Sequence, residues 1–139
     1  MSLRTFLHRT TISGRGRYIA WSLLCIAIGI GSRLQHSDNV VVDKYLGDGA
    51  YAVLIYLMIS TVRPHGAAGM RALSAFAISC AIEFFQLTGV GASLRESGSL
   101  LPRLLGVVLG SGFSVLDIFA YAAGIALILL IDTTIFRSR

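Results

Sequence analysis

The sequence predicts an all-α, polytopic membrane protein with four transmembrane helices and a short re-entrant or interfacial segment before the last. Three observations predict this class. Of the 139 residues, 55% are hydrophobic and only 14% are charged, whereas a soluble domain carries about 25% charged residues. The mean hydropathy is +0.74. The apolar residues also gather into runs that basic residues flank, which is typical of spanning helices. The length allows one domain over residues 1–139, with a basic cytoplasmic segment at 1–16 and a helical bundle over 17–135.

The first apolar run covers residues 18–32 and is bounded by Arg17 and Arg33. That interval is about 24 Å long in a helix, against a hydrocarbon core of about 30 Å. Either the helix runs past its charged ends, or one charged end lies below the membrane surface. We favour the second at Arg33, because Arg17 has basic neighbours that hold it at the other interface. The run lacks an A-x-A-like cleavage site, so we expect a retained helix rather than a signal peptide.

Three further runs follow. Residues 48–62 and 116–131 are also short by the standard of about 20 residues for a full crossing, whereas 67–88 is long enough. Residues 98–115 contain an apolar stretch that is too short to span, broken by Gly110 and its neighbours. We expect this segment to re-enter or lie at the interface; a fifth span is the alternative. Gly106 and Gly110 have small-xxx-small spacing, and we expect them, with Gly124, to mediate helix packing.

The distribution of basic residues predicts the orientation. Eight of the twelve lie on one side of a four-span arrangement: Arg4, Arg9, Arg15, Arg17, Arg63, Arg71, Arg137 and Arg139. The positive-inside rule then puts both termini in the cytoplasm. Basic residues that flank apolar runs indicate lipid headgroups as partners and not nucleic acid. Tyr18, Trp21 and Tyr45 are expected to be interfacial anchors.

The cysteines, Cys25 and Cys80, both lie within apolar runs, where they pack as small residues and predict no disulfide. The histidines show no metal-ligand spacing. We therefore expect no metal site and no cofactor.

Glu83 is the most informative residue, because it lies inside an apolar run long enough to cross a membrane. A carboxylate at that depth is costly, so it usually faces a bundle interior or a wet cavity and has a partner. Other costly residues fall near the same outer ends of the predicted helices. The candidate ligand-binding residues are Arg33, Asp48, Glu83, Gln86, Arg95, Asp117 and Tyr121.

Helical spacing supports a shared site. Glu83 and Gln86 follow Ser79 at i+4 and i+7, while Tyr121 and Gly124 follow Asp117 in the same way. A charged residue at a helix centre costs about 2.5–3.5 kcal/mol, so pairing of arginines with the acids is expected. The alternative is that these pairs only fasten four thin helices together.

Four parts of the chain form a recognisable order: Tyr45-Leu46-Gly47-Asp48, the segment from Ile82 to Leu87, Arg95 and the stretch LGSGFSVLDIFAYAAG at 109–124. In these parts the chain resembles the DUF2809 family of small bacterial membrane proteins. The order Glu83, Gln86, Arg95, Asp117 and Gly124 is also similar to VanZ-type proteins, which implies four spans and a family-level link to glycopeptide resistance. The chain departs from that pattern at Tyr121, where VanZ-type sequences usually carry Asn.

We expect the outward-facing polar pocket to bind the headgroup of a lipid or cell-envelope precursor in the bacterial inner membrane. Arg33 and Arg95 would meet phosphate or carboxylate. One alternative is an accessory or assembly subunit, with other membrane proteins as partners. Another is an intramembrane enzyme that uses Glu83 and Asp117 as paired carboxylates. Transport is the weakest reading, since the inner helix halves are apolar apart from Tyr56.

Overall fold

The computed structural model describes residues 14–34, 40–109 and 112–136, and every regular element in those ranges is a helix. Side chains of residues 32–34 and 40–43 fall outside this description. The elements are α2 (Gly14–Leu34), α3 (Val40–Val62), α4 (Ala68–Gln86), α5 (Val90–Arg95), α6 (Leu100–Leu109), α7 (Val115–Ile131) and the π-helical turn η2 (Asp132–Phe136).

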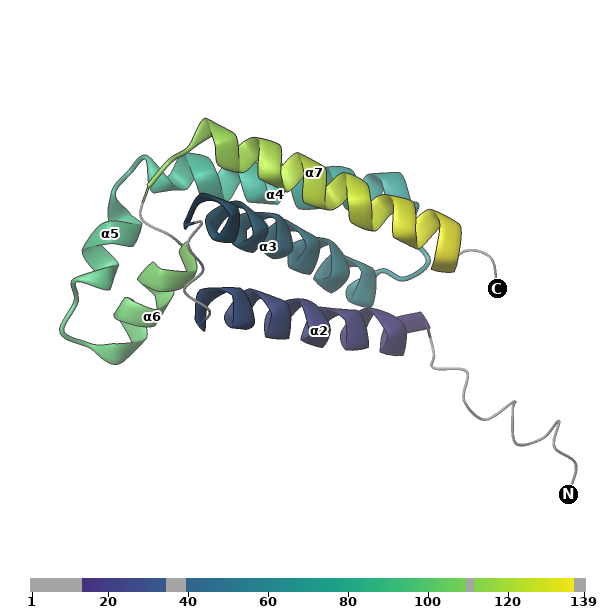
Figure 1. The fold of residues 1–139 in the computed structure, drawn as a ribbon, viewed down its shortest axis with the longest axis horizontal. Coiled ribbons are helices and arrows are strands. Elements are labelled where there is room, and N and C mark those ends of the chain that lie inside the picture. Colours follow the sequence, from purple (N-terminus) through teal and green to yellow (C-terminus); the bar gives the residue numbers. More distant parts are fainter. Residues whose placement is uncertain (1–13, 35–39, 110–111, 137–139) are drawn as a thin grey trace, which may run out of the picture.

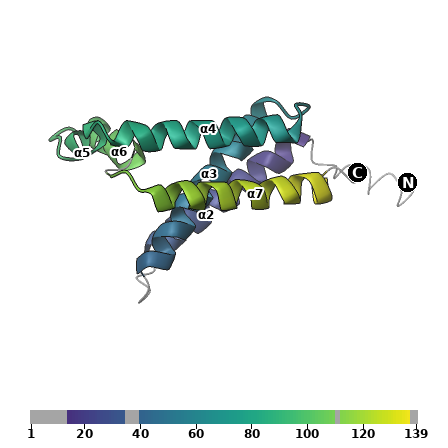
Figure 2. The same ribbon diagram turned by 90° about the horizontal axis from the view of Figure 1, so that it is seen from above.

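Four long helices form an antiparallel bundle in which α3 is central (Figure 1). α2, α4 and α7 each pack against α3, and α4 also packs against α7. Seen from above, α4 and α7 run alongside each other while α2 and α3 cross them at an angle (Figure 2). α2 begins and α7 ends at the same end of the bundle. We call this end the inner end, after the charge distribution, and the opposite end the outer end.

Three helices are long and apolar enough to cross a membrane: Lys44–Val62, Ala68–Gln86 and Val115–Ile135. α2 is not among them, so the fourth crossing stays a prediction. Its 21 residues span about 32 Å, and the helix continues past Arg17 at one end and Arg33 at the other. The position of Arg33 relative to the membrane surface stays a prediction. α2 and α3 are longer than the apolar runs 18–32 and 48–62, because each helix also includes charged residues in its first turns.

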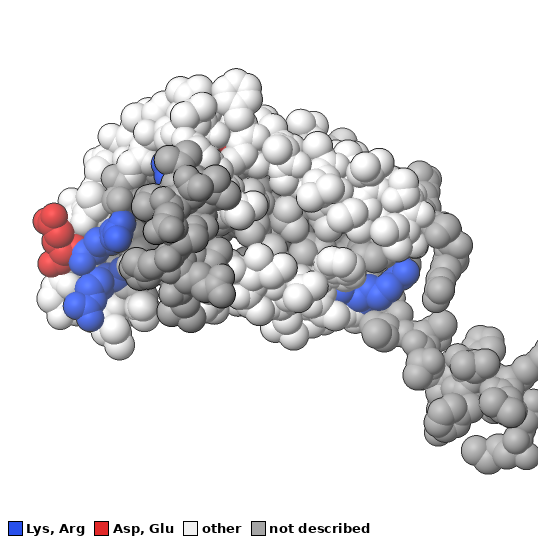
Figure 3. All heavy atoms as spheres, viewed as in Figure 1, with Lys and Arg blue, Asp and Glu red and all other residues white. Residues whose placement is uncertain are grey.

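The bundle exposes many large apolar side chains. Large side chains such as Leu23, Leu73 and Phe119 are 61–67% exposed, which is the inverse of a soluble protein and suits lipid contact. On the face in Figure 3, charged side chains gather mainly toward the two ends of the molecule. The buried apolar core is small and includes Ala52, Leu57, Ala75, Ile125 and Ile128.

The segment between α4 and α7 is a helical hairpin, α5 with α6, beyond the outer end of the bundle (Figure 1). Gly89 begins it with φ of 72°, a left-handed conformation that glycine adopts without steric cost. α6 has ten residues, too few to cross a membrane. A Cβ on Gly106 would lie 2.5 Å from the Arg95 nitrogen and 2.7 Å from the Gly91 oxygen. Glycine at 106 therefore permits the close contact of α5 with α6.

Candidate functional site

Buried polar side chains form two clusters, one at each end of the bundle. The outer cluster comprises Lys44, Asp48, Glu83, Ser114, Asp117 and Tyr121. The inner cluster comprises Tyr18, Tyr56, Arg71 and Asp132. α4 contributes to both clusters from a single buried face, on which Arg71, Ala75, Ser79 and Glu83 follow at intervals of four residues.

Glu83 is the centre of the outer cluster and is fully buried. Its Oε2 accepts a hydrogen bond of 2.7 Å from the Tyr121 hydroxyl, and its Oε1 accepts one of 2.6 Å from the Ser114 backbone N–H. Ser114 is the residue at which α7 starts, and its own side chain makes no capping bond. The carboxylate thus meets the positive end of the α7 dipole, which stabilises negative charge. Glu83 joins α4 to α7 and holds the start of α7 in place.

Asp117 lies in the first turn of α7 and is 5% exposed. Its Oδ1 is 3.2 Å from Lys44 Nζ, and the lysine side chain is 52% exposed. This contact is an ion pair, and a carboxylate oxygen can accept more than one donor. Asp48 lies close enough to Lys44 and Tyr121 to interact electrostatically with both.

The other predicted site residues lie apart from this cluster or outside the described side chains. Gln86 donates a 2.8 Å hydrogen bond to the Leu109 carbonyl, which ties α4 to the end of α6. Arg95 is exposed in the α5–α6 hairpin. The side chain of Arg33 and the whole of Gly110 lie outside the described part of the chain. Lys44, which sequence reasoning treated only as a topology signal, contacts Asp117 in the outer cluster.

Gly124 provides a close approach between α7 and α3. A Cβ at this position would lie 2.6 Å from the Gly49 carbonyl oxygen and 3.2 Å from the Gly49 Cα. Both contacts are with backbone, which cannot move aside as a side chain can. Glycine at 124 therefore allows the two helices to touch one turn below Tyr121, as expected for a packing residue.

The inner cluster is a network around Asp132, which is 4% exposed. The Asp132 carboxylate accepts hydrogen bonds from Tyr18 at 2.8 Å, from Tyr56, and from Arg71 Nη2 at 2.9 Å. Arg71 Nη1 also donates to the Tyr18 oxygen at 3.0 Å. The guanidinium carbon lies 5.4 Å and 5.6 Å from the centres of the two tyrosine rings, which is cation–π distance. The network joins four helices at the inner end.

This second cluster corrects two sequence interpretations. Tyr18 is 6% exposed and not an anchor at the lipid interface, because its hydroxyl bonds Asp132. Arg71 is 7% exposed and lies inside α4, so it is a paired interior charge in addition to any topological role. The signal that could have found the cluster is Asp132, an acid that follows directly on the apolar run of α7.

Both oxygens of Glu83 already accept hydrogen bonds from the protein, so Glu83 positions Tyr121 and α7. The Lys44 ammonium is the exposed group of the Lys44–Asp117 pair, whereas Asp117 Oδ1 is buried. Among the described residues, no group of three or more His, Cys, Asp and Glu side chains is arranged to hold a metal ion.

Comparison with known proteins gives one match. The family model described as "Protein of unknown function (DUF2809)" matches residues 37–125, which is well over half of the chain. No curated protein and no solved structure matches. The matched range contains the whole outer cluster, whereas Tyr18 and Asp132 of the inner cluster lie beyond it. The chain belongs to the DUF2809 family.

Proposed function

We propose that this protein binds the headgroup of a membrane lipid, or of a lipid-linked cell-envelope precursor, at the outer cluster. The observation that carries the proposal is the Lys44–Asp117 pair. It combines a half-exposed ammonium with a buried carboxylate oxygen that has spare acceptor capacity. A polar group at membrane depth that is prepared for a further partner is a functional-site signal.

The charge balance indicates the kind of headgroup. Lys44 is available to a phosphate. Asp117 beside Lys44 offers carboxylate oxygens, which favour hydrogen-bond donors such as an amine or sugar hydroxyls. A phosphate-linked headgroup with an amine or hydroxyl group fits both requirements. Contact of Arg33 and Arg95 with phosphate or carboxylate stays a prediction beside this role of Lys44.

Native mass spectrometry of the protein released from membranes tests the proposal. Lys44→Ala removes the exposed ammonium that pairs with buried Asp117, and we expect loss of a retained phospholipid from protein that is still folded. Arg103→Ala is the matched control, because Arg103 is an exposed base on α6 outside the cluster. Asp117→Asn keeps the shape of the side chain, and it should reduce the preference for amine-bearing over purely anionic lipid. Unchanged retention in both cluster variants would refute headgroup recognition.

The membrane arrangement belongs to the same proposal: a bacterial inner membrane, four crossings that include α2, both termini in the cytoplasm, and the α5–α6 hairpin at the outer interface. The common position of the start of α2 and the end of α7 supports an even number of crossings. The exposed apolar residues of α6 support interfacial contact, as at Leu101 and Val108. The VanZ-like relationship is also proposed here, from the order of Glu83, Gln86 and Asp117 in the sequence.

Cysteine labelling tests this topology. In a background without Cys25 and Cys80, Ser99→Cys in the hairpin should react with a membrane-impermeant maleimide added outside. His65→Cys, in the loop before α4, should react only after the membrane is opened. Both positions are exposed, so the two variants differ in sidedness alone. Equal labelling from outside would contradict the four-span arrangement.

A further inference from the structure

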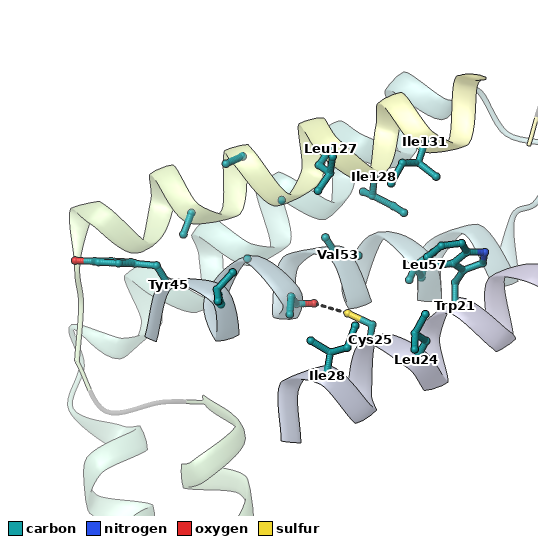
Figure 4. Close-up of a pocket in the computed structure, with 16 residues that line it drawn as sticks. Trp21, Leu24, Cys25, Ile28, Tyr45, Val53, Leu57, Leu127, Ile128 and Ile131 are labelled. Atoms are coloured by element: carbon teal, nitrogen blue, oxygen red, sulfur yellow. Dashed lines mark hydrogen bonds between the residues drawn. The ribbon is translucent and has the colours of Figure 1, made fainter. Parts of the chain in front are cut away.

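An apolar groove runs along the bundle between α2 and α7, with α3 beneath it (Figure 4). We call it the α2/α7 groove. Its volume is about 680 Å³, within the range of about 300–1,000 Å³ typical of ligand sites. Its lining is almost entirely hydrocarbon and includes Trp21, Ile28, Tyr45, Leu57, Ala123 and Ile131. The thiol of Cys25 also lines it, and this polar group is satisfied by a 3.1 Å hydrogen bond to the Ala50 carbonyl.

At the inner end of the groove the Tyr18 hydroxyl donates a hydrogen bond to Asp132, which joins the first turns of α2 to the end of α7. Trp21, Leu57 and Ile131 lie toward this end, while Ile28 and Tyr45 lie toward the other (Figure 4). Away from the inner end, α2 and α7 each pack on α3, and the groove lies between α2 and α7.

The groove is at least as long as one leaflet of a bilayer is thick. From Tyr45 to Leu57, both of which line it, α3 rises about 18 Å. Half of a hydrocarbon core of about 30 Å is about 15 Å. A chain that enters at the outer end can therefore extend past the bilayer midplane toward the Tyr18–Asp132 contact at the inner end.

The outer end of the groove leads to the outer cluster. Tyr45 lines the groove, and the neighbouring Lys44 pairs with Asp117, with its ammonium 5.7 Å from the centre of the Tyr45 ring. The apolar α2/α7 groove thus leads to an exposed ammonium, which is complementary in charge to a lipid phosphate. A lipid has this same order of groups: a hydrocarbon chain, then a phosphate at the interface.

We propose that the α2/α7 groove holds one acyl chain of an outer-leaflet lipid. The position of the lipid headgroup rests on the proposed function, whereas seating of the chain does not. The ligand class is therefore a long-chain phospholipid or lipid-linked precursor held at both its polar and its apolar part, and not a free headgroup.

Trp21 provides the probe, because it lines the groove and is the single tryptophan of the chain. The purified full-length protein in detergent is titrated with phosphatidylethanolamine carrying brominated acyl chains, which quench indole fluorescence on contact. We expect quenching that saturates at one lipid per chain. Ala123→Phe projects a ring into the groove and should weaken this saturable binding by roughly tenfold or more. Ala122→Phe is the matched control on the same helix, exposed but outside the groove lining.

The outcomes separate this inference from the proposed function. Equal saturable quenching in Ala122→Phe and Ala123→Phe, or quenching that never saturates, overturns chain binding in the groove. If Lys44→Ala loses binding and Ala123→Phe keeps it, the headgroup proposal stands and the proposal of chain binding in the groove is overturned. The reverse result supports the groove and refutes the headgroup proposal. Size-exclusion chromatography with light scattering accompanies each variant, since an oligomer that Ala123→Phe dissociates would assign the groove to a second copy and overturn the inference.

Discussion

Removal of the Arg71–Asp132 pair at the inner end should destabilise the bundle strongly. Asp132→Leu deletes the acceptor of three hydrogen bonds and leaves Arg71, 7% exposed, as a charge without its counter-ion. Breaking a buried pair by removing one partner costs about 3–5 kcal/mol. The tyrosine bonds are part of the same network, so their loss is not added separately. The expected change in the unfolding equilibrium is therefore roughly 100- to 4,000-fold.

A double-mutant cycle separates the cost of leaving one charge unpaired from the cost of losing side-chain volume. Arg71→Met alone should be less damaging than Asp132→Leu, because the carboxylate left behind still accepts hydrogen bonds from Tyr18 and Tyr56. The double variant replaces both charges by apolar groups, and such replacements are often neutral or stabilising. We expect it to recover most of the loss caused by Asp132→Leu.

The assay is reversible unfolding in mixed micelles, followed by the fluorescence of Trp21. Thr134→Ala is the control, because Thr134 is exposed on the same π-helical turn and its hydroxyl bonds only a carbonyl of its own helix. The control should be close to neutral. A double variant no more stable than Asp132→Leu would refute the argument that an unpaired charge, and not lost packing, dominates the cost.

Three further predictions concern single positions. Gly124→Ala should lower the free energy of unfolding by about 1–3 kcal/mol, because the added methyl pushes α7 off α3. At Gly47 an added Cβ meets nothing within 4 Å, so Gly47→Ala should be neutral or stabilising by up to about 1 kcal/mol. The same unfolding assay checks both variants, and equal effects would contradict the backbone contact at Gly124. Glu83→Gln replaces one acceptor oxygen by a donor that faces an existing donor, and should cost about 1.5–3 kcal/mol; an unchanged midpoint would remove Glu83 from its positioning role. Gln86→Leu should free the end of α6, seen as faster hydrogen exchange in the hairpin with an unchanged bundle; equal exchange would show that the 2.8 Å bond to Leu109 contributes nothing.

The helices and the outer acids were predictable from the sequence for a simple physical reason. Apolar runs and Pro or Gly breaks determine where helices form, so the ranges at α4 and α7 are close to the predicted ones. α3 begins eight residues before Asp48, at Val40, because a helix can include charged residues that hydropathy alone assigns to a loop. Glu83 and Tyr121 were grouped correctly by helical spacing, since each lies on the buried face of its helix.

The partner of each acid was not predictable in the same way. Arg71 and Lys44 follow the pattern of interfacial lysines and arginines, and only tertiary packing shows that one is buried and the other reaches Asp117. Long basic side chains can point in several directions from one backbone position. The groove is likewise a property of how α2 diverges from α7, which no local pattern encodes.

The buried face of α4 also restricts how the bundle can move. Arg71 and Glu83 are about 18 Å apart on this helix, and each is fixed to the same neighbour, α7 with its continuation η2. A slide of α4 by one turn, about 5.4 Å, would pull both charges from their partners at once. Piston-like motion of α4 is therefore suppressed. Tyr18 joins α2 to the same network through Asp132, so a slide of α7 would break contacts with both α4 and α2.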